Sequence, residues 1–189
     1  SSGNFDLVLT LGALAQAAGI TTVTFAGTGT GDSVTVSAAF TNALTVNVGS
    51  DAAINTVVAS ASAATITLAG AGTDFDTVAN VFTGGSGSSD VIKITQTDDS
   101  IVAADTASWS GFEKITTVGT AGTLALTLDG AAVASGATMT INATSMTNEV
   151  FTFVGTGETS TTPGHFVITT AGTADNIITL GSGNDSYTN

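Results

Sequence analysis

The sequence predicts an all-β protein of the β-solenoid or β-roll type, in which short strands stack as coils joined by turns rich in Gly and Asp. Three observations favour this fold. Short runs alternate apolar and small polar residues, the runs recur at a regular spacing, and the turns between them repeat a Gly-x-Gly-x-Asp composition. Alternation with a period of two, in runs rich in β-branched residues, is typical of half-buried strands. A β-sandwich of short strands is the alternative.

The spacing and composition of the runs favour the solenoid over the sandwich. One apolar marker residue per run gives steps of 9 to 15 residues, with a mean of about 12. Only 11 of the 189 residues are aromatic, whereas sandwich cores usually rely on aromatic side chains. The markers are small to medium residues, most of them β-branched, which suit stacked coils: Val23, Val34, Val46, Val57, Ile66, Val78, Ile92, Ile101, Ile115, Leu126, Ile141, Phe153, Val167 and Ile178.

The alternating runs define the expected strands, and two segments depart from them. Residues 11–19 contain helix formers followed by Gly19, which predicts one or two helical turns. Residues 98–109 are first polar and then rich in Ala, which predicts a loop with a helical turn. The chain is interpreted as a single repetitive β domain over 1–189, with an insertion around 96–112 as its candidate seam. The expected strands are 21–25, 33–36, 44–48, 65–68, 90–94, 114–118, 124–128, 139–141, 150–154, 166–169 and 177–180.

Charge excludes several classes of partner. The chain has 15 acidic and two basic side chains, with a net charge of −13, so it cannot neutralise a nucleic-acid backbone and would be repelled by an anionic membrane surface. No apolar run approaches the roughly 18 residues of a membrane span, so membrane insertion is not expected. The absence of Cys and the single His exclude disulfides and Cys/His zinc sites. Hard divalent cations, chiefly Ca²⁺, remain as the ligands that such a chain attracts.

No catalytic residue is predicted. The sequence has none of the common hydrolase, zinc-protease or nucleotide-binding motifs, and no Ser and Asp are placed to form a triad with His165. The carboxylate pairs Asp74/Asp76 and Asp98/Asp99 would also suit glycosidase-like acid–base work. Asp residues that are solvated in turns, or that bind Ca²⁺, explain these pairs more simply.

The sharpest motif lies at the C-terminal end. Residues 171–179 align without a gap on residues 180–188, and the second unit fits the nonapeptide G-G-x-G-x-D-x-U-x, except for Leu180 at the first Gly, with Tyr187 as its large residue. The glycines let the backbone turn and expose carbonyl oxygens, while the acidic position adds a carboxylate. Since nine residues make half a coil, successive turns are expected on opposite edges of the stack. The predicted Ca²⁺ ligands in these two units are Gly181, Gly183, Asn184, Asp185, Asp175 and Asn176.

Degenerate copies of the motif occur upstream. Residues 69–74 match its first positions and end at Asp74, residues 84–92 have one extra residue before Asp90, and residues 27–34 have the same slip before Asp32. Residues 155–158 are a weaker match. Asp32, Asp74 and Asp90 are therefore further candidate Ca²⁺ ligands. The alternative for each is a Gly-rich turn with a solvated Asp.

The two C-terminal nonapeptides resemble the RTX calcium-binding β-roll family. Residues 84–94, followed by the segment from Trp109 to Ile115, are similar to a block found in RTX-linked bacterial S-layer and large surface proteins. The resemblance implies Ca²⁺-dependent folding after secretion, a location on the bacterial cell surface, and a segment of a longer chain whose nonapeptide repeats start at 171–189. Trp109 and Phe112 are interpreted as core anchors for the insertion.

These observations leave three functional hypotheses. The first is a non-enzymatic structural protein, a Ca²⁺-stabilised β-solenoid segment of an S-layer-like coat whose partners are copies of itself. The second is a self-assembling extracellular filament or adhesin subunit, with a cell-surface polysaccharide as a candidate partner. The third is the accessory β-roll of a secreted hydrolase, whose catalytic domain is not visible in these residues.

Overall fold

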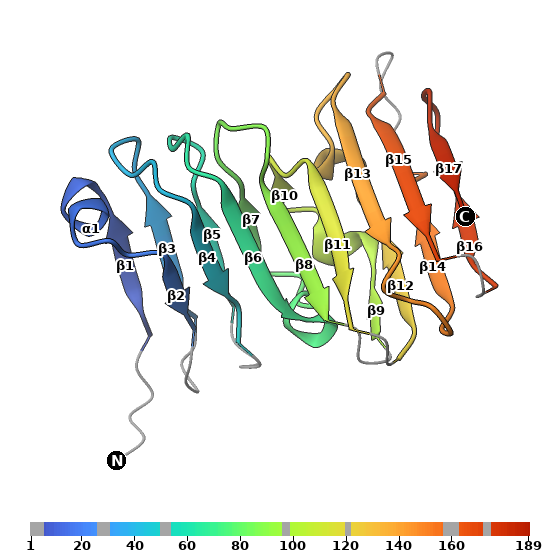
Figure 1. The fold of residues 1–189 in the computed structure, drawn as a ribbon, viewed down its shortest axis with the longest axis horizontal. Coiled ribbons are helices and arrows are strands. Elements are labelled where there is room, and N and C mark those ends of the chain that lie inside the picture. Colours follow the sequence, from blue (N-terminus) through green and yellow to red (C-terminus); the bar gives the residue numbers. More distant parts are fainter. Residues whose placement is uncertain are drawn as a thin grey trace.

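The computed structural model describes residues 6–25, 31–49, 54–95, 99–119, 122–156, 163–171 and 175–189. In these ranges the protein is a β-solenoid, as Figure 1 shows, with its strands in three sheets. Every strand pair between described residues is parallel and in register, for example Val8 beside Ser33 and Val91 beside Lys114. Parallel pairing between successive coils excludes the sandwich, in which neighbouring strands are largely antiparallel. The prediction of a β-solenoid is confirmed.

One face of the solenoid is a single eight-stranded sheet, here called the long sheet, which runs from one end of the described chain to the other (Figure 1). Its strands alternate in sequence with those of the opposite face, except that two strands of the opposite face, β9 (Asp99–Ile101) and β10 (Trp109–Ser110), lie between β8 and β11. The strands of the long sheet are β2 (Thr22–Thr24), β4 (Leu44–Asn47), β6 (Ile66–Ala71), β8 (Val91–Thr95), β11 (Lys114–Val118), β13 (Thr138–Ala143), β15 (His165–Thr170) and β17 (Ser186–Thr188).

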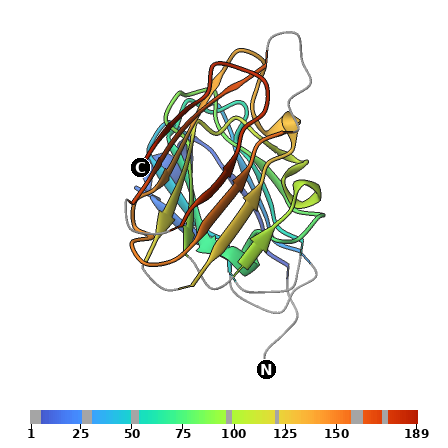
Figure 2. The ribbon, with the colours of Figure 1, turned by 90° about the vertical axis from the view of Figure 1, so that its right-hand side faces the viewer.

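The opposite face consists of two sheets that follow one another along the stack. The N-terminal sheet contains β1 (Val8–Leu11), β3 (Ser33–Val36), β5 (Thr56–Val58), β7 (Val81–Thr83) and β10 (Trp109–Ser110). The C-terminal sheet contains β9 (Asp99–Ile101), β12 (Leu124–Thr127), β14 (Phe151–Val154) and β16 (Ile177–Thr179). Figure 2, turned by 90° from Figure 1, shows the two faces enclosing a narrow interior.

The length of a coil explains the spacing in the sequence. Most residues lie above a partner 22 to 28 positions earlier, as Asp32 lies above Leu7, 25 residues before it. Two strands per coil therefore give the mean step of about 12 residues. The last coil is shorter, because Asp185 lies only 19 residues after its partner Phe166. The final two strands, β16 and β17, belong to opposite faces, as the nonapeptide offset of nine predicts.

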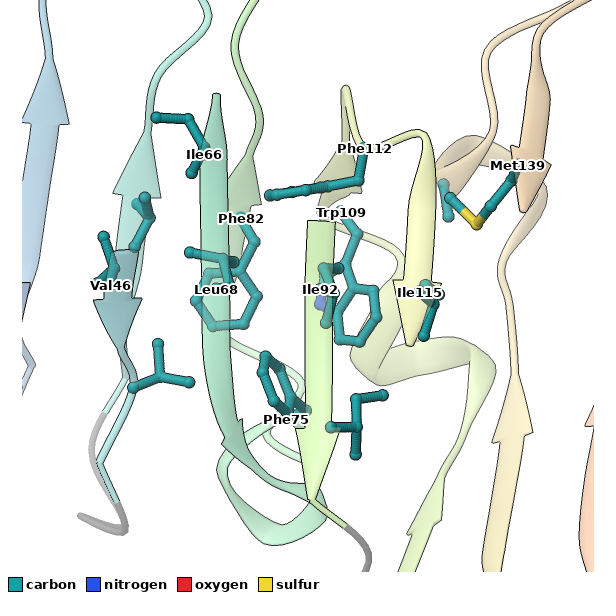
Figure 3. Close-up of a cluster of buried hydrophobic side chains, with 14 of the residues drawn as sticks. Val46, Ile66, Leu68, Phe75, Phe82, Ile92, Trp109, Phe112, Ile115 and Met139 are labelled. Atoms are coloured by element: carbon teal, nitrogen blue, oxygen red, sulfur yellow. The ribbon is translucent and has the colours of Figure 1, made fainter. Parts of the chain in front are cut away.

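Because apolar and small polar residues alternate along each strand, every second side chain points into the interior. Figure 3 shows Val46, Leu68, Ile92 and Ile115 of the long sheet pointing inward toward the opposite face. Most marker residues lie in this core, but Val78 and Val167 do not. Val167 is 37% exposed on the outer face of β15, where Phe166 and Ile168 are the buried residues. Val78 is 61% exposed, and Phe82 is the buried residue of that segment instead. The spacing placed the marker four residues too early because the turn before β7 is longer than the average.

The predicted seam at 96–112 is where the second face changes from one sheet to the other. The expected helical turn is present as α2 (Ala103–Thr106), but the flanking strands β9 and β10 were not predicted. Trp109 and Phe112 are buried, and Trp109 packs edge-on against Phe75, so their interpretation as core anchors is confirmed (Figure 3). The short 3₁₀ turns η1 (Gly72–Asp74) and η2 (Gly130–Ala132) pack beside β9 and β10 respectively, which covers strand edges that would otherwise be exposed.

The predicted N-terminal helical turn is α1 (Ala13–Ala17), which connects β1 to β2. It ends as expected, with the N–H of Gly19 donating to the carbonyl oxygen of Gln16 at 2.9 Å. Within the described ranges, no helix is long and apolar enough to cross a membrane.

Candidate metal-binding turns

Four of the predicted Ca²⁺ ligands share a position in the fold. Asp32, Asp90, Asn176 and Asp185 each stand immediately before a strand, and Asn80 and Glu113 occupy the same place before β7 and β11. We call these six side chains strand-entry acceptors. Each accepts a hydrogen bond from the backbone N–H of the residue in register on the preceding coil, at distances between 2.6 and 3.2 Å. The N–H donors, in the order of the chain, are those of Leu7, Asn55, Ile66, Asp90, Phe151 and Phe166.

The strand-entry acceptors extend the backbone ladder of each parallel sheet by one residue. In a regular parallel ladder, the N–H of the coil below would donate to a backbone carbonyl of the next coil. A carboxylate or carboxamide oxygen takes that N–H instead. A buried N–H without an acceptor costs about 1–3 kcal/mol, and an ionised acceptor gives the stronger bond. A structural role at the coil junction therefore accounts for the acidic residues in front of strands.

Asp90 is the most enclosed of the strand-entry acceptors. Its side chain is 0% exposed, with Oδ1 accepting from the N–H of Ile66 at 2.6 Å and Oδ2 from the N–H of Gly85 at 2.7 Å. The Gly84–Gly85 backbone thus folds around the carboxylate of its own turn. Burial raises the pKa of Asp90, while these two N–H bonds oppose the rise.

Glu113 lies directly above Asp90 and completes a short column of carboxylates. Its Oε2 accepts from the N–H of Asp90 at 2.9 Å. The pKa of Glu113 is raised mainly by burial and further by the nearby charge of Asp90, while the hydrogen bond from the Asp90 N–H lowers it. Glu113 was not among the ligands predicted from the sequence. Its place one residue before the strand at 114–118, like that of Asp90 before β8, is the signal that would have found it.

Two other buried carboxylates cap local turns instead of stacking on a coil. Asp74 accepts from the N–H of Ala71 at 2.7 Å within η1, and Asp105 accepts from the N–H of Val102 at 2.8 Å at the start of α2. Asp74 was expected at the start of a strand, but β7 begins only at Val81. Residues 69–71 are the end of β6 instead, so this copy of the motif folds differently from the others.

The C-terminal turn brings together Gly181, Gly183, Asn184 and Asp185. A Cβ atom on Gly181 would lie 2.5 Å from the carbonyl oxygen of Gly155, so this turn packs directly on the connection below it. Gly183 has φ of 137°, which L side chains rarely adopt. The N–H of Asn184 donates to Nδ1 of His165 at 3.0 Å, and Oδ1 of Asp185 accepts from the N–H of Phe166 at 2.9 Å.

The preceding nonapeptide turn carries Asp175 and Asn176. The Asp175 side chain is exposed, and Oδ1 of Asn176 accepts from the N–H of Phe151 at 3.2 Å. By the register of β14 and β16, Asp175 lies above Val150, so Glu149 is one residue away on the same edge of the coil below. Glu149 is a half-exposed carboxylate that was not predicted as a ligand. Residues 172–174 of this unit lie outside the described residues, as do residues 26–30 of the copy that ends at Asp32.

These turns differ in how well their oxygen atoms are placed to bind Ca²⁺. Ca²⁺ takes six to eight oxygen ligands from carboxylates, carbonyls and water. Asp185 is half-exposed and uses one carboxylate oxygen for the coil below, so it retains capacity for a cation. A cation at Asp90 would compete with two N–H donors already in place. Among the residues that the structure describes, no three His, Cys, Asp or Glu side chains gather as a metal-binding group, so a site here would draw on backbone carbonyls and water.

Comparison of the chain with protein-family models, curated proteins and solved structures finds no match. The fold and its coil junctions define the class of this protein as a parallel β-solenoid with strand-entry acceptors. Its function is therefore inferred from its residues and their geometry.

Proposed function

We propose that this chain is a non-enzymatic structural segment of an S-layer-like coat on a bacterial cell surface, stabilised by Ca²⁺ at its coil edges. One observation carries the proposal. The acidic side chains lie at the turns and strand ends of a repetitive stack, while its outer faces are almost free of charge. A rod of this kind offers long uniform surfaces for neighbouring molecules and concentrates its negative charge where backbone carbonyls are also exposed.

The metal dependence follows from electrostatics. Carboxylates crowded on neighbouring turns repel one another, and the net charge of −13 opposes compaction of the whole chain. Bound Ca²⁺ supplies positive charge that offsets this repulsion. Asp185 and Asn184 would hold it at one edge, with carbonyl oxygens of the Gly181–Gly183 turn, and Asp175 with Asn176 at the other. Since the folded turns bind the cation better than the unfolded chain does, external Ca²⁺ would stabilise the fold by mass action.

The direct test is thermal unfolding of the purified chain in Ca²⁺ and in EGTA. We expect the Tm to be higher in Ca²⁺, and the Ca²⁺-dependent part of the Tm to shrink in the double variant Asp175→Ala/Asp185→Ala. Asp129→Asn is the matched control, because Asp129 caps η2 through the N–H of Ala131 and belongs to neither nonapeptide. An unchanged Tm and unchanged assembly in EGTA would show that the metal-dependent proposal is wrong.

A self-assembling extracellular filament, or an adhesin subunit, is the second candidate. The composition of the stack favours it, because parallel coils that carry few charges on their strands pair readily with further strands. Electron microscopy of the purified protein separates the two, since a coat gives a two-dimensional lattice and the second candidate gives filaments or single particles.

A further inference from the structure

The outer face of the long sheet is nearly uncharged and built mostly from short side chains. Every second side chain along each strand points outward. Outward side chains that are in register on neighbouring strands form two rows, and each row crosses all eight strands. Neither row contains a carboxylate or an aromatic residue. The first row is Thr22, Thr45, Thr67, Val91, Lys114, Thr140, Val167 and Ser186, and the second is Thr24, Asn47, Ala69, Lys93, Thr116, Asn142, Thr169 and Thr188.

Both basic side chains of the whole sequence lie on this face, side by side. Lys93 of β8 pairs with Thr116, and Lys114 of β11 pairs with Val91, so the two lysines are diagonal neighbours on adjacent strands. Diagonal neighbours of this kind have Cα atoms about 7–8 Å apart. Among the described residues, neither lysine has a hydrogen-bond or ion-pair partner. We call the surface around Lys93 and Lys114 the lysine face.

A surface of opposite charge lies at the edge of the same part of the stack. Asp76 follows η1 and is exposed, and Asp99 begins β9 beside η1. Oδ2 of Asp99 is buried and has no hydrogen-bond partner among the described residues. Burial raises the pKa of Asp99, and the charge of Asp76 adds to the rise. Oδ1 of Asp99 accepts from the N–H of Ser100 at 2.9 Å, so this turn, here called the acidic edge, offers another molecule chiefly the exposed carboxylate of Asp76 beside the half-buried Asp99.

We propose that the lysine face of one molecule binds the acidic edge of a second copy. This inference rests on the proposed function as a self-associating coat and adds the surfaces that would make the contact. Because a face meets an edge, one molecule of the pair keeps a free edge and the other keeps a free face after the contact forms. Such a heterologous contact can be repeated from molecule to molecule, and it builds open filaments unless the rotation between copies closes a ring.

A second copy fits the lysine face better than a neutral glycan does. Sugars usually bind proteins by stacking on aromatic side chains, and the two outward rows contain none. An acidic polysaccharide would satisfy the lysines, but it would meet the net charge of −13 along its whole length. A neighbouring copy can instead place one local acidic edge on the lysines and keep its other acidic turns in solvent.

The test is a charge swap followed by analytical ultracentrifugation. The face variant is Lys93→Glu/Lys114→Glu, and the edge variant is Asp76→Lys/Asp99→Asn, where the milder change suits the half-buried Asp99. In Ca²⁺ and about 0.1 M NaCl, where exposed charges interact over about 10 Å, each variant alone is expected to weaken self-association at least about tenfold. An equimolar mixture is expected to recover association, because each variant supplies the partner that the other lacks.

A matched control carries new charges on the opposite face. Thr35→Glu/Thr83→Glu places two carboxylates on outward positions of the N-terminal sheet, and we expect it to associate like the unmodified chain. Circular dichroism and the Tm of each variant confirm that the fold is kept. Association of both charge variants at the unmodified strength, or an unmodified chain that stays monomeric at every concentration, would overturn the inference.

Alginate binding and the response to EGTA give two further readouts. Alginate serves as an acidic-polysaccharide probe. If the face variant lost alginate binding but kept its self-association, the lysine face would be assigned to a polysaccharide, and the proposed contact between copies would be overturned. The same samples are melted in Ca²⁺ and in EGTA. A Tm that does not respond to EGTA rejects the Ca²⁺-stabilised coat, whereas the charge swap still decides whether copies meet through the lysine face.

Discussion

Two Gly-rich turns that end in Asp adopt different structures. One lies in the middle of the stack and the other at its C-terminal end. In the central turn, the Asp90 carboxylate is buried and accepts N–H bonds from the coil below and from Gly85 of its own turn. In the C-terminal turn, the half-exposed Asp185 accepts one N–H bond from the described residues, that of Phe166. The central turn is closed around its carboxylate, and the terminal turn is open.

The difference comes from position in the stack and from one extra residue. β8 lies between β6 and β11, so Asp90 has a coil on each side, whereas β17 is the outermost strand described in the long sheet. The longer central turn also lets the Asp90 side chain fold back on the N–H of Gly85, five residues earlier. A similar composition thus gives a structural cap in one place and a ligand-accessible carboxylate in the other.

Removing the two carboxylates gives the largest expected contrast. Asp90→Ala leaves the buried N–H of Ile66 and the partly buried N–H of Gly85 without their acceptor, so we expect a loss of about 3–5 kcal/mol in the free energy of unfolding. Asp185→Ala removes one bond at a half-exposed position and should cost about 1 kcal/mol or less in EGTA. Urea unfolding measures both. Equal losses would mean that the central turn is no more closed than the terminal one.

Adding one methyl group to each turn tests the same contrast through packing. A Cβ atom on Gly84 would overlap the carbonyl oxygen of Gly111, a backbone atom in the middle of the stack, so Gly84→Ala should cost about 2–3 kcal/mol. Gly183→Ala also meets backbone, 2.6 Å from the carbonyl oxygen of Gly164, but Gly183 lies in an exposed turn that can adjust to the contact. We expect about 1 kcal/mol there, measured by the same urea titration. A larger loss at Gly183 than at Gly84 would contradict the view that the terminal coil is less constrained.

The smallest expected effect concerns pH and the central column of carboxylates. The pKa values of Asp90 and Glu113 are both raised, chiefly by burial, so their ionised forms are less favourable in the folded state than in the unfolded chain. Their contribution to stability therefore increases as pH falls through the raised folded-state pKa values. Glu113→Gln should stabilise the fold at neutral pH, by less than about 1 kcal/mol because solvent screens the partly exposed group, and the gain should vanish in acid.

The pH prediction has an internal control in the neighbouring residue. In an Asp90→Asn background the repelling charge is gone, so the gain from Glu113→Gln should become smaller. Stability curves at several pH values, measured for the single and double variants, show this as non-additivity. A Glu113→Gln gain that persists unchanged in acid would show that ionisation of Glu113 is not its source.

The sequence was most informative about the periodic parts of the fold. The run at 33–36 became β3 and the run at 114–118 became β11 without a shift at either end, because alternating apolar residues must face one interior. It was least informative at the seam. β9 has the sequence Asp-Ser-Ile and β10 has Trp-Ser, which carry almost no strand pattern and become strands only because neighbouring coils pair with them.

The candidate site divides in the same way. That Asp32, Asp90, Asn176 and Asp185 stand directly before strands was predictable without any structure, since Gly-rich turns and β-branched runs are local signals. The hydrogen-bond partner of each oxygen was not predictable, because it depends on which residue of the preceding coil lies in register, about 19 to 25 positions away. The lysine face arises in the same way, because the 21 residues that separate Lys93 from Lys114 bring them onto neighbouring strands only when the coils stack.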